Sequence, residues 1–134
     1  MYWASHVAGE AAGVACAAGN AVLDVVLAPG FLAAVDDTAR YLWRGLEALA
    51  RQYPGVFTQP RGAGLICGLQ CALPNTQVQN AALAQGLLTV AAGDNVLRLV
   101  PPLIIGRAEC DEALALLGRA AQACQPAIAE ALTP

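Results

Sequence analysis

The sequence predicts an α+β domain in which a small antiparallel sheet of about three strands is backed by helices. Two observations carry this prediction. Apolar residues recur at helical spacing between residues 32 and 49, and a Gly-Asp-Asn turn separates two β-prone runs between residues 87 and 100. Together with the patterns in the rest of the chain, these two observations predict the order helix, helix, strand, helix, strand, strand, helix.

Helical patterns occupy the first part of the chain. Small residues and then a Val-Leu cluster run from Ala11 to Leu27, and Pro29-Gly30 should end this first helix. The second helix carries an apolar stripe at alternating three- and four-residue steps, and Pro54-Gly55 should end it. The stripe consists of Leu32, Val35, Ala39, Leu42, Leu46 and Leu49.

The next segment, RGAGLICGLQCAL from Arg61 onwards, predicts one extended stretch entered through a glycine-rich bend. Its first four residues, RGAG, are too few for a phosphate-binding loop and indicate a tight turn. After Pro74 we expect a short helix, with Asn75 or Thr76 as its N-terminal cap and Gly86 as its stop.

Residues 87–100 predict a β-hairpin. The runs LLTVA and VLRLV flank AGDN, whose glycine, aspartate and asparagine suit a tight turn. Pro101-Pro102 should end the second strand, because proline has no N–H to donate to a neighbouring strand. A last helix is expected from Arg107 to Cys124, with Gln125-Pro126 ending it and residues 125–134 forming a tail.

The composition predicts a domain that packs against another domain or subunit. Hydrophobic residues make up 57% of the 134 residues and charged residues 13%, against about 25% charged in an average globular domain. We therefore expect apolar surface meant for another domain or subunit. A net charge of −3 argues against nucleic acid as a partner, since nucleic acid requires clustered cations. All seven cationic side chains are arginines, so the sequence contains no lysine.

The five cysteines are odd in number and follow no disulfide framework. We expect reduced core residues and a cytoplasmic location. No metal site is expected, because the chain has a single histidine and only one close pair of cysteines, Cys67 and Cys71. The sequence also shows no signal peptide and no uninterrupted apolar stretch that would span a membrane.

Arg98 is the candidate functional residue. It is the only cation in the apolar run AAGDNVLRLVPPLII, and on a strand the side chains of Leu97, Arg98 and Leu99 must divide between two faces. Two interpretations stay open on spacing alone: a solvated arginine, or a guanidinium that binds a carboxylate through two hydrogen bonds. Catalytic residues are not evident, because the single histidine, His6, has no partner group.

Three blocks of the chain resemble one enzyme family. They are AQGLLTVAAGDNVLRLVPPLIIGRAECDEAL, RGAGLICGLQ and ACAAGNAVLDVV, and the similarity covers residues 14–122. The first block resembles the C-terminal segment of acetylornithine aminotransferases, which are class III pyridoxal-phosphate-dependent aminotransferases. The resemblance implies the small domain of a fold-type I aminotransferase at residues 14–124, preceded by an altered stretch at residues 1–13. It also implies that Arg98 binds the α-carboxylate of the substrate.

The chain departs from this family at the residues that catalysis uses. The family requires a lysine that forms a Schiff base with pyridoxal phosphate, and this sequence has none. Ala8 lies where the family has a threonine that binds the phosphate of the cofactor, and Glu10 would repel that phosphate. Gly106 replaces a threonine before the last helix, a smaller change because glycine also caps helices. No pyridoxal phosphate is therefore expected on this chain alone.

Two functions stay open. In the first, the chain is the C-terminal domain of an acetylornithine-type aminotransferase and contributes Arg98 to a site that a lysine-bearing large domain or partner subunit completes. Such an enzyme would move an amino group from an N-acetylornithine-like ω-amino acid to 2-oxoglutarate. In the second, the chain is a non-catalytic remnant or oligomerisation module that keeps the fold and associates with itself through its apolar surface.

Overall fold

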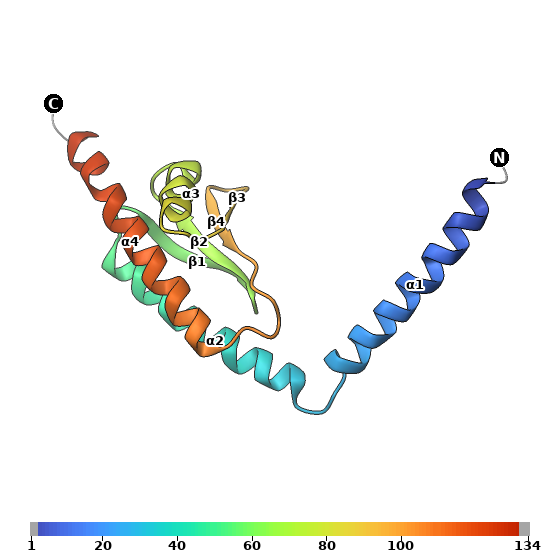
Figure 1. Ribbon diagram of the computed structural model, residues 1–134. Helices are drawn as coiled ribbons and strands as arrows, with labels where there is room; N and C mark the ends of the chain where they lie inside the picture. Colours follow the sequence, from blue (N-terminus) through green and yellow to red (C-terminus); the bar gives the residue numbers. More distant parts are fainter. Residues whose placement is uncertain (1–2, 132–134) are drawn as a thin grey trace. The chain divides into compact units, whose positions relative to one another are not determined.

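The computed structural model describes the backbone of residues 3–131 and the side chains of residues 12–125. The chain divides into two compact units, Met1–Ala34 and Val35–Pro134. The elements follow in the order α1 (Trp3–Val26), α2 (Phe31–Gln52), β1 (Phe57–Ala63), β2 (Ile66–Cys71), α3 (Asn75–Ala84), β3 (Val90–Ala92), β4 (Val96–Leu99) and α4 (Arg107–Ala131) (Figure 1). This is the predicted α+β class, with four strands where the sequence suggested about three.

The first unit contains α1 and the start of α2. Helix α1 ends at Val26, just before Pro29 and Gly30, as predicted. Gly30 has a φ of 86°, a left-handed conformation that glycine adopts without strain, and it separates the two helices. In the part of the chain that the structure describes, no single helix is long and apolar enough to cross a membrane. There, only α1 and α2 together, as a bent pair, have the length and apolar composition of a membrane span.

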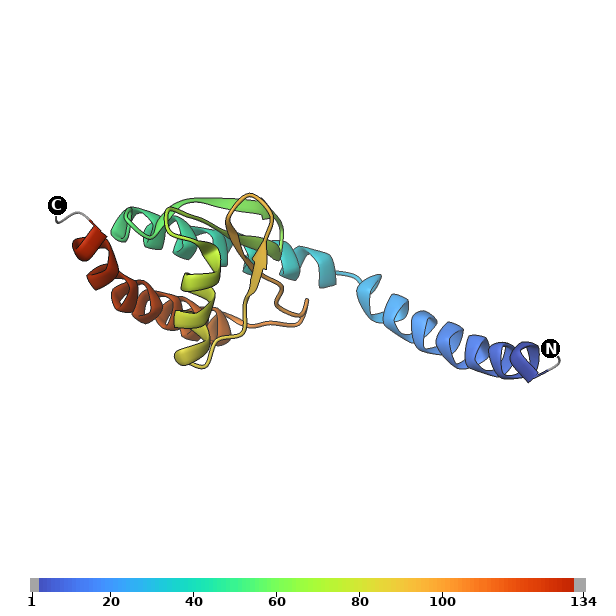
Figure 2. The ribbon, with the colours of Figure 1, turned by 90° about the horizontal axis from the view of Figure 1, so that it is seen from above.

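Helices α2 and α4 lie side by side on one face of the sheet (Figures 1 and 2). The Tyr41 hydroxyl of α2 donates a hydrogen bond to the Asp111 carboxylate of α4 at 2.6 Å, and the Arg107 guanidinium lies 5.1 Å from the centre of the Tyr41 ring. The stripe predicted for α2 faces the core from Ala39 to Leu49. The first two residues of the predicted stripe differ: Val35 is half-buried and Leu32 is exposed, so the periodicity indicated the apolar face correctly only from Ala39 onwards.

The core lies between these two helices and the sheet. Side chains with 1% or less of their surface exposed include Phe57, Leu69 and Leu97 of three strands, and Leu46, Val78 and Leu117 of α2, α3 and α4. One face of the sheet is therefore apolar and covered. The other face, called the open face below, carries no helix among the described residues of the second unit.

The four strands form one antiparallel sheet in the order β1-β2-β4-β3. The sequence predicted one extended segment from Arg61, whereas the structure has the hairpin β1–β2 there. That prediction missed β1 because its sequence, FTQPRGA, is polar and contains Pro60. Proline is tolerated because β1 is an edge strand. Gly64, with a φ of 56°, lies in the tight turn that RGAG predicted.

Helix α3 begins without the side-chain cap that the sequence predicted. Pro74 occupies the cap position, and no side chain caps the first turn. The choice of Asn75 or Thr76 as the cap is therefore wrong: Asn75 is already helical, and its amide bonds to the β3–β4 hairpin instead. Gly86, with a φ of 88°, ends the helix region as predicted.

Helix α4 runs from Arg107 to Ala131, so the predicted end at Gln125-Pro126 is wrong. A proline inside a helix removes a single N–H donor and crowds the preceding turn. The surrounding sequence is rich in alanine, the strongest helix former, and the helix continues through Pro126. The start of α4 agrees with the prediction, because Gly106 precedes the helix and its N–H donates to the Glu109 carboxylate at 3.1 Å.

Candidate functional site

Arg98 lies on β4 and on the open face of the sheet. Its neighbours Leu97 and Leu99 are buried in the core, while Arg98 is exposed. This alternation confirms the predicted division of the three side chains between the two faces. Within the second unit, the Arg98 guanidinium is accessible to a ligand that approaches the open face.

A tight turn and two asparagine side chains hold β4 in place. Asp94 and Asn95 both have left-handed backbones, with φ of 56° and 57°, as in the type I′ turn that suits β-hairpins. The Asn95 amide donates to the carbonyls of Cys71 and Leu73 at 2.8 Å each. The Asn75 amide donates to a carbonyl of each hairpin strand, at 2.8 and 3.0 Å. Strand β4 is thereby tied to β2 and α3, which fixes the backbone from which Arg98 projects.

A second arginine shares the open face with Arg98. Arg61 of β1 pairs with Gly68 of β2, and Gly68 pairs in turn with Arg98 of β4. Residues directly opposite each other on neighbouring strands project from the same face, so the two arginines flank a glycine on the open face. Both arginines line one pocket of about 220 Å³, together with Val96 and Asp94.

Sequence reasoning missed Arg61 as part of a site, because RGAG indicated a turn and nothing more. What places Arg61 beside Arg98 is the register of β1 on β2 and of β2 on β4. Such pairing joins residues far apart in the chain, so local spacing carries no signal for it. A correct prediction would have needed the strand order first.

Neither arginine of the open face pairs with a carboxylate among the described residues. Arg61 donates to the side-chain oxygen of Gln70, at 3.3 Å from Nε and 3.1 Å from a terminal nitrogen. The ion pairs of the described residues involve Arg40 and Arg51 of α2 instead, so neither Arg61 nor Arg98 is neutralised by a carboxylate there. A guanidinium without an acidic partner can bind a carboxylate through two hydrogen bonds. The open face therefore has the chemistry of an anion-binding site.

The cysteines of the second unit are core residues, as predicted. Cys67, Cys71, Cys110 and Cys124 are buried free thiols, whereas Cys16 of α1 is exposed, which corrects the prediction for that residue. Between residues 12 and 34, the described side chains of the first unit include none that is buried, so the small residues of α1 form no core there. Burial raises the pKa of Cys67, beside the pocket, to about 11, so its thiol is protonated and unreactive at neutral pH. No group of three metal-binding side chains occurs among the described residues.

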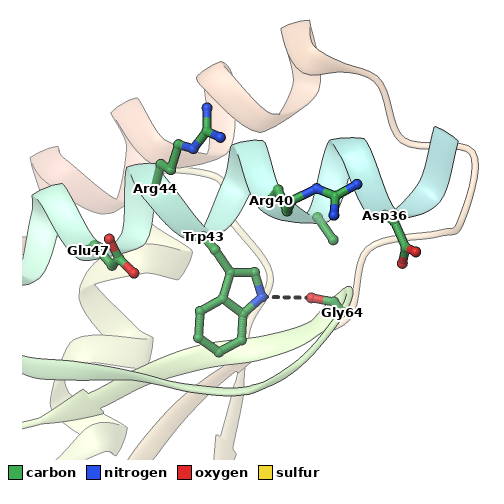
Figure 3. A pocket seen from close by; sticks show the side chains of 7 residues that line it. Asp36, Arg40, Trp43, Arg44, Glu47 and Gly64 are labelled. Carbon is green, nitrogen blue, oxygen red and sulfur yellow. Dashed lines mark hydrogen bonds between the residues drawn. The ribbon is translucent and has the colours of Figure 1, made fainter. Parts of the chain in front are cut away.

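A larger pocket, of about 500 Å³, lies between α2 and the β1–β2 turn (Figure 3). Its walls carry two carboxylates and two guanidinium groups, so their charges balance. Arg40 already pairs with Asp37 at 2.9 Å. The Trp43 indole donates to the Gly64 carbonyl at 2.8 Å and so holds the turn against α2. The charges of this pocket balance, whereas the open face carries two arginines that form no ion pair among the described residues.

Pyridoxal phosphate, the cofactor that the sequence resemblance implies, does not fit the residues of this chain. The cofactor requires a lysine amine, and the sequence has no lysine. Ala8 and Glu10, which the resemblance relates to the phosphate site, belong to α1, and their side chains lie outside the described residues. The described side chains include no lysine that would hold the cofactor covalently.

A four-stranded antiparallel sheet with helices on one face and two arginines on the other defines the α+β domain. Comparison with known protein families identifies the family to which this domain belongs. Residues 10–121 match the class III aminotransferases, a match that runs from α1 into α4. The chain belongs to this family, and the resemblance that the sequence blocks indicated is confirmed.

Relatives with similar sequences are acetylornithine aminotransferases. The enzyme of Mesorhizobium japonicum is 50% identical over 118 residues, which cover 88% of this chain and 30% of the relative. That of Brucella melitensis is 51% identical over 98 residues, which cover 73% of this chain and 24% of the relative. The chain thus spans less than a third of the length of these relatives.

Solved structures agree with the sequence comparison. The N-acetylornithine aminotransferase of Stenotrophomonas maltophilia matches with a TM-score of 0.73 and 31% identity, over 81% of this chain and 30% of that chain. An acetylornithine aminotransferase of Elizabethkingia anophelis matches with a TM-score of 0.72, and at 23% identity it supports the fold alone. The α+β fold of the family is therefore present in this chain.

Proposed function

We propose that this chain is the carboxylate-binding part of an acetylornithine-type aminotransferase and that it works only with a lysine-bearing partner. In this role Arg98 binds the α-carboxylate of an N-acetylornithine-like ω-amino acid, whose amino group is transferred to 2-oxoglutarate. The bond-breaking chemistry belongs to the partner, because this sequence has no lysine for a Schiff base.

The observation that carries the proposal is the position of Arg98. It is exposed on the open face and takes no part in the ion pairs of the described residues. Its strand is held by the Asn75 and Asn95 hydrogen bonds, so the guanidinium projects from a rigid base. A fixed, planar donor group can bind a carboxylate through two hydrogen bonds at a lower entropic cost than a flexible one.

Reconstitution from two chains tests this proposal. The full 134-residue chain is mixed with the lysine-bearing remainder of the Mesorhizobium japonicum enzyme, expressed separately, and transamination of acetylornithine is measured. We expect activity from the mixture and none from either chain alone. A matched control replaces the Schiff-base lysine of the remainder by alanine. If the two chains associate and the mixture is inactive, the proposal is wrong.

A self-associating module is the second candidate, and exposed apolar side chains favour it. Leu88, Val100 and Ile104 are 82%, 62% and 80% exposed. In an aminotransferase such a surface would meet the partner, whereas in a non-catalytic module a second copy of the chain would cover it. A stable dimer of the isolated chain in sedimentation experiments, combined with failure of the two-chain reconstitution, would support the module.

A further inference from the structure

We propose that Arg61 is a second carboxylate-binding residue of the open face, so that this face takes small dicarboxylates in preference to monocarboxylates. One carboxylate of the ligand binds Arg98 and the other binds Arg61. The inference rests on the proposed role of Arg98 and adds to it a residue of a different strand.

The sheet register places the two arginines in one row. Arg61, Gly68 and Arg98 lie opposite one another on β1, β2 and β4, so the two arginine backbones are two strand spacings, or ~10 Å, apart. Gly68 has no side chain, so its position leaves the space between them open, and the Gln70 side chain, two residues further along β2, reaches Arg61 from one side. The guanidinium groups at the two ends of this row suit the two ends of a short dicarboxylate such as glutarate.

The gap at Gly68 is required by the backbone. A Cβ atom at this position would collide with the Leu97 carbonyl oxygen and lie 3.0 Å from the Arg98 Cα. Strands β2 and β4 therefore approach so closely here that only glycine fits. The space between the two arginines is thus a fixed property of the sheet.

The environment of Arg61 shows that its donors lack a charged acceptor. Arg61 donates twice to the side-chain oxygen of Gln70, and Gln59 donates to the same oxygen at 2.9 Å. Three donor hydrogen bonds thus converge on one neutral amide oxygen. A carboxylate is a stronger acceptor than an amide, so a ligand carboxylate can replace Gln70 at the Arg61 guanidinium.

One acidic residue of the pocket opposes anion binding. Asp94, in the turn between β3 and β4, lines the same pocket as Arg61 and Arg98. Removing its charge should strengthen the binding of a dicarboxylate, whereas removing the charge of Arg61 or Arg98 should weaken it. Asparagine suits the left-handed backbone of this position, where φ is 56°, so Asp94→Asn should keep the turn.

The test is a titration of the full 134-residue chain with glutarate and with butyrate at low ionic strength, followed through the Nε–Hε signals of arginine in NMR spectra. We expect glutarate to bind about tenfold more tightly than butyrate, because it gains a second charged contact. Arg61→Gln should remove that preference and leave butyrate binding unchanged. Arg98→Gln should weaken both ligands, and Asp94→Asn should bind glutarate about two- to threefold more tightly.

Two further variants keep the test decisive. Arg44→Gln removes the same charge from α2, outside the open face, and should leave both affinities within about twofold. Gln70→Glu places a carboxylate against Arg61 and should abolish the preference for glutarate even if Arg61→Gln fails to fold. Circular dichroism confirms that each variant is folded.

The outcomes separate this inference from the proposed function. If Arg61→Gln and Gln70→Glu both keep the preference for glutarate, or if Arg44→Gln loses it equally, the role of Arg61 is overturned and that of Arg98 stands. If Arg98→Gln leaves butyrate binding unchanged, the carboxylate-binding role of Arg98 is itself overturned. Equal affinity of the unaltered chain for glutarate and butyrate also overturns the role of Arg61.

Discussion

Asn95 is the residue on which the hairpin around Arg98 depends most. Its side chain accepts a hydrogen bond from the Asn75 N–H at 2.8 Å and donates to the carbonyls of Cys71 and Leu73. Its backbone is left-handed, which asparagine tolerates better than most residues with a Cβ atom. One side chain thus joins the hairpin turn to the end of β2 and the start of α3.

We therefore predict that Asn95→Ala lowers the free energy of unfolding by about 2–4 kcal/mol, through lost hydrogen bonds and backbone strain. Asn95→Gly is the matched comparison, because it loses the same bonds and accepts the left-handed backbone. It should cost about 1–3 kcal/mol. Urea unfolding measures both values. Equal stability of Asn95→Ala and the unaltered chain would refute this account of the turn.

The buried thiols predict how stability depends on pH. Burial raises the pKa of Cys67 and of Cys71 from 9.0 to about 11. The folded chain therefore holds these protons at pH values where the unfolded chain releases them. The free energy of unfolding should be insensitive to these thiols below pH 9 and should fall as the pH rises from 9.0 to about 11.

Urea unfolding between neutral pH and the folded pKa of the thiols checks this dependence. The double variant Cys67→Ala, Cys71→Ala is the control: its stability is lower at every pH because cavities remain, but its decline in the alkaline range should be shallower. An identical alkaline decline in the double variant and the unaltered chain would mean that other groups cause it.

At the scale of elements, the Leu114 side chain of α4 packs against α2 at Gly45. A Cβ atom there would collide with the Leu114 side chain. Gly45→Ala should therefore destabilise the fold by about 1–3 kcal/mol, although alanine by itself favours a helix by about 1 kcal/mol. In a Leu114→Ala background the collision is absent, and the same change should stabilise. Thermal unfolding of the four proteins measures the difference, and the same sign in both backgrounds would contradict this packing.

The elements that the sequence predicted well are those determined by local chemistry. The α2 stripe depends on helical periodicity, the β3–β4 turn on Asp94 and Asn95 accepting left-handed backbones, and the end of α3 on Gly86. Strand β1 escaped prediction because its polar sequence with Pro60 forms a strand only through pairing with β2. The cap of α3 was wrong for a similar reason, since the Asn75 amide bonds to a hairpin distant in sequence.

Of the two arginines in the candidate site, only one could be predicted from the sequence. Arg98 could be found because one cation in an apolar strand is conspicuous in the sequence. Arg61 could not, because its position beside Arg98 follows from two strand registers that no local pattern encodes. Resemblance to aminotransferases suggested what Arg98 binds, while the row of Arg61, Gly68 and Arg98 became visible only in the sheet.

For the whole molecule, the proposed function concerns substrate binding and not the covalent chemistry. The chain spans less than a third of the length of its relatives, has no lysine and exposes large apolar side chains such as Leu88 and Ile104. Arginines on the open face have the chemistry to orient a carboxylate, but the sequence has no lysine to form a Schiff base with a cofactor. Binding by Arg98 is therefore the central claim for this chain.

The most direct test of that claim is kcat/KM for acetylornithine in a single-chain chimera. Residues 14–124 of this chain replace the matching segment of the Mesorhizobium japonicum enzyme, so that activity does not depend on two chains associating. Arg98→Ala should lower kcat/KM by about one to three orders of magnitude, while Arg44→Ala, the control, should keep it within about twofold. An active chimera in which Arg98→Ala leaves kcat/KM unchanged would contradict the account.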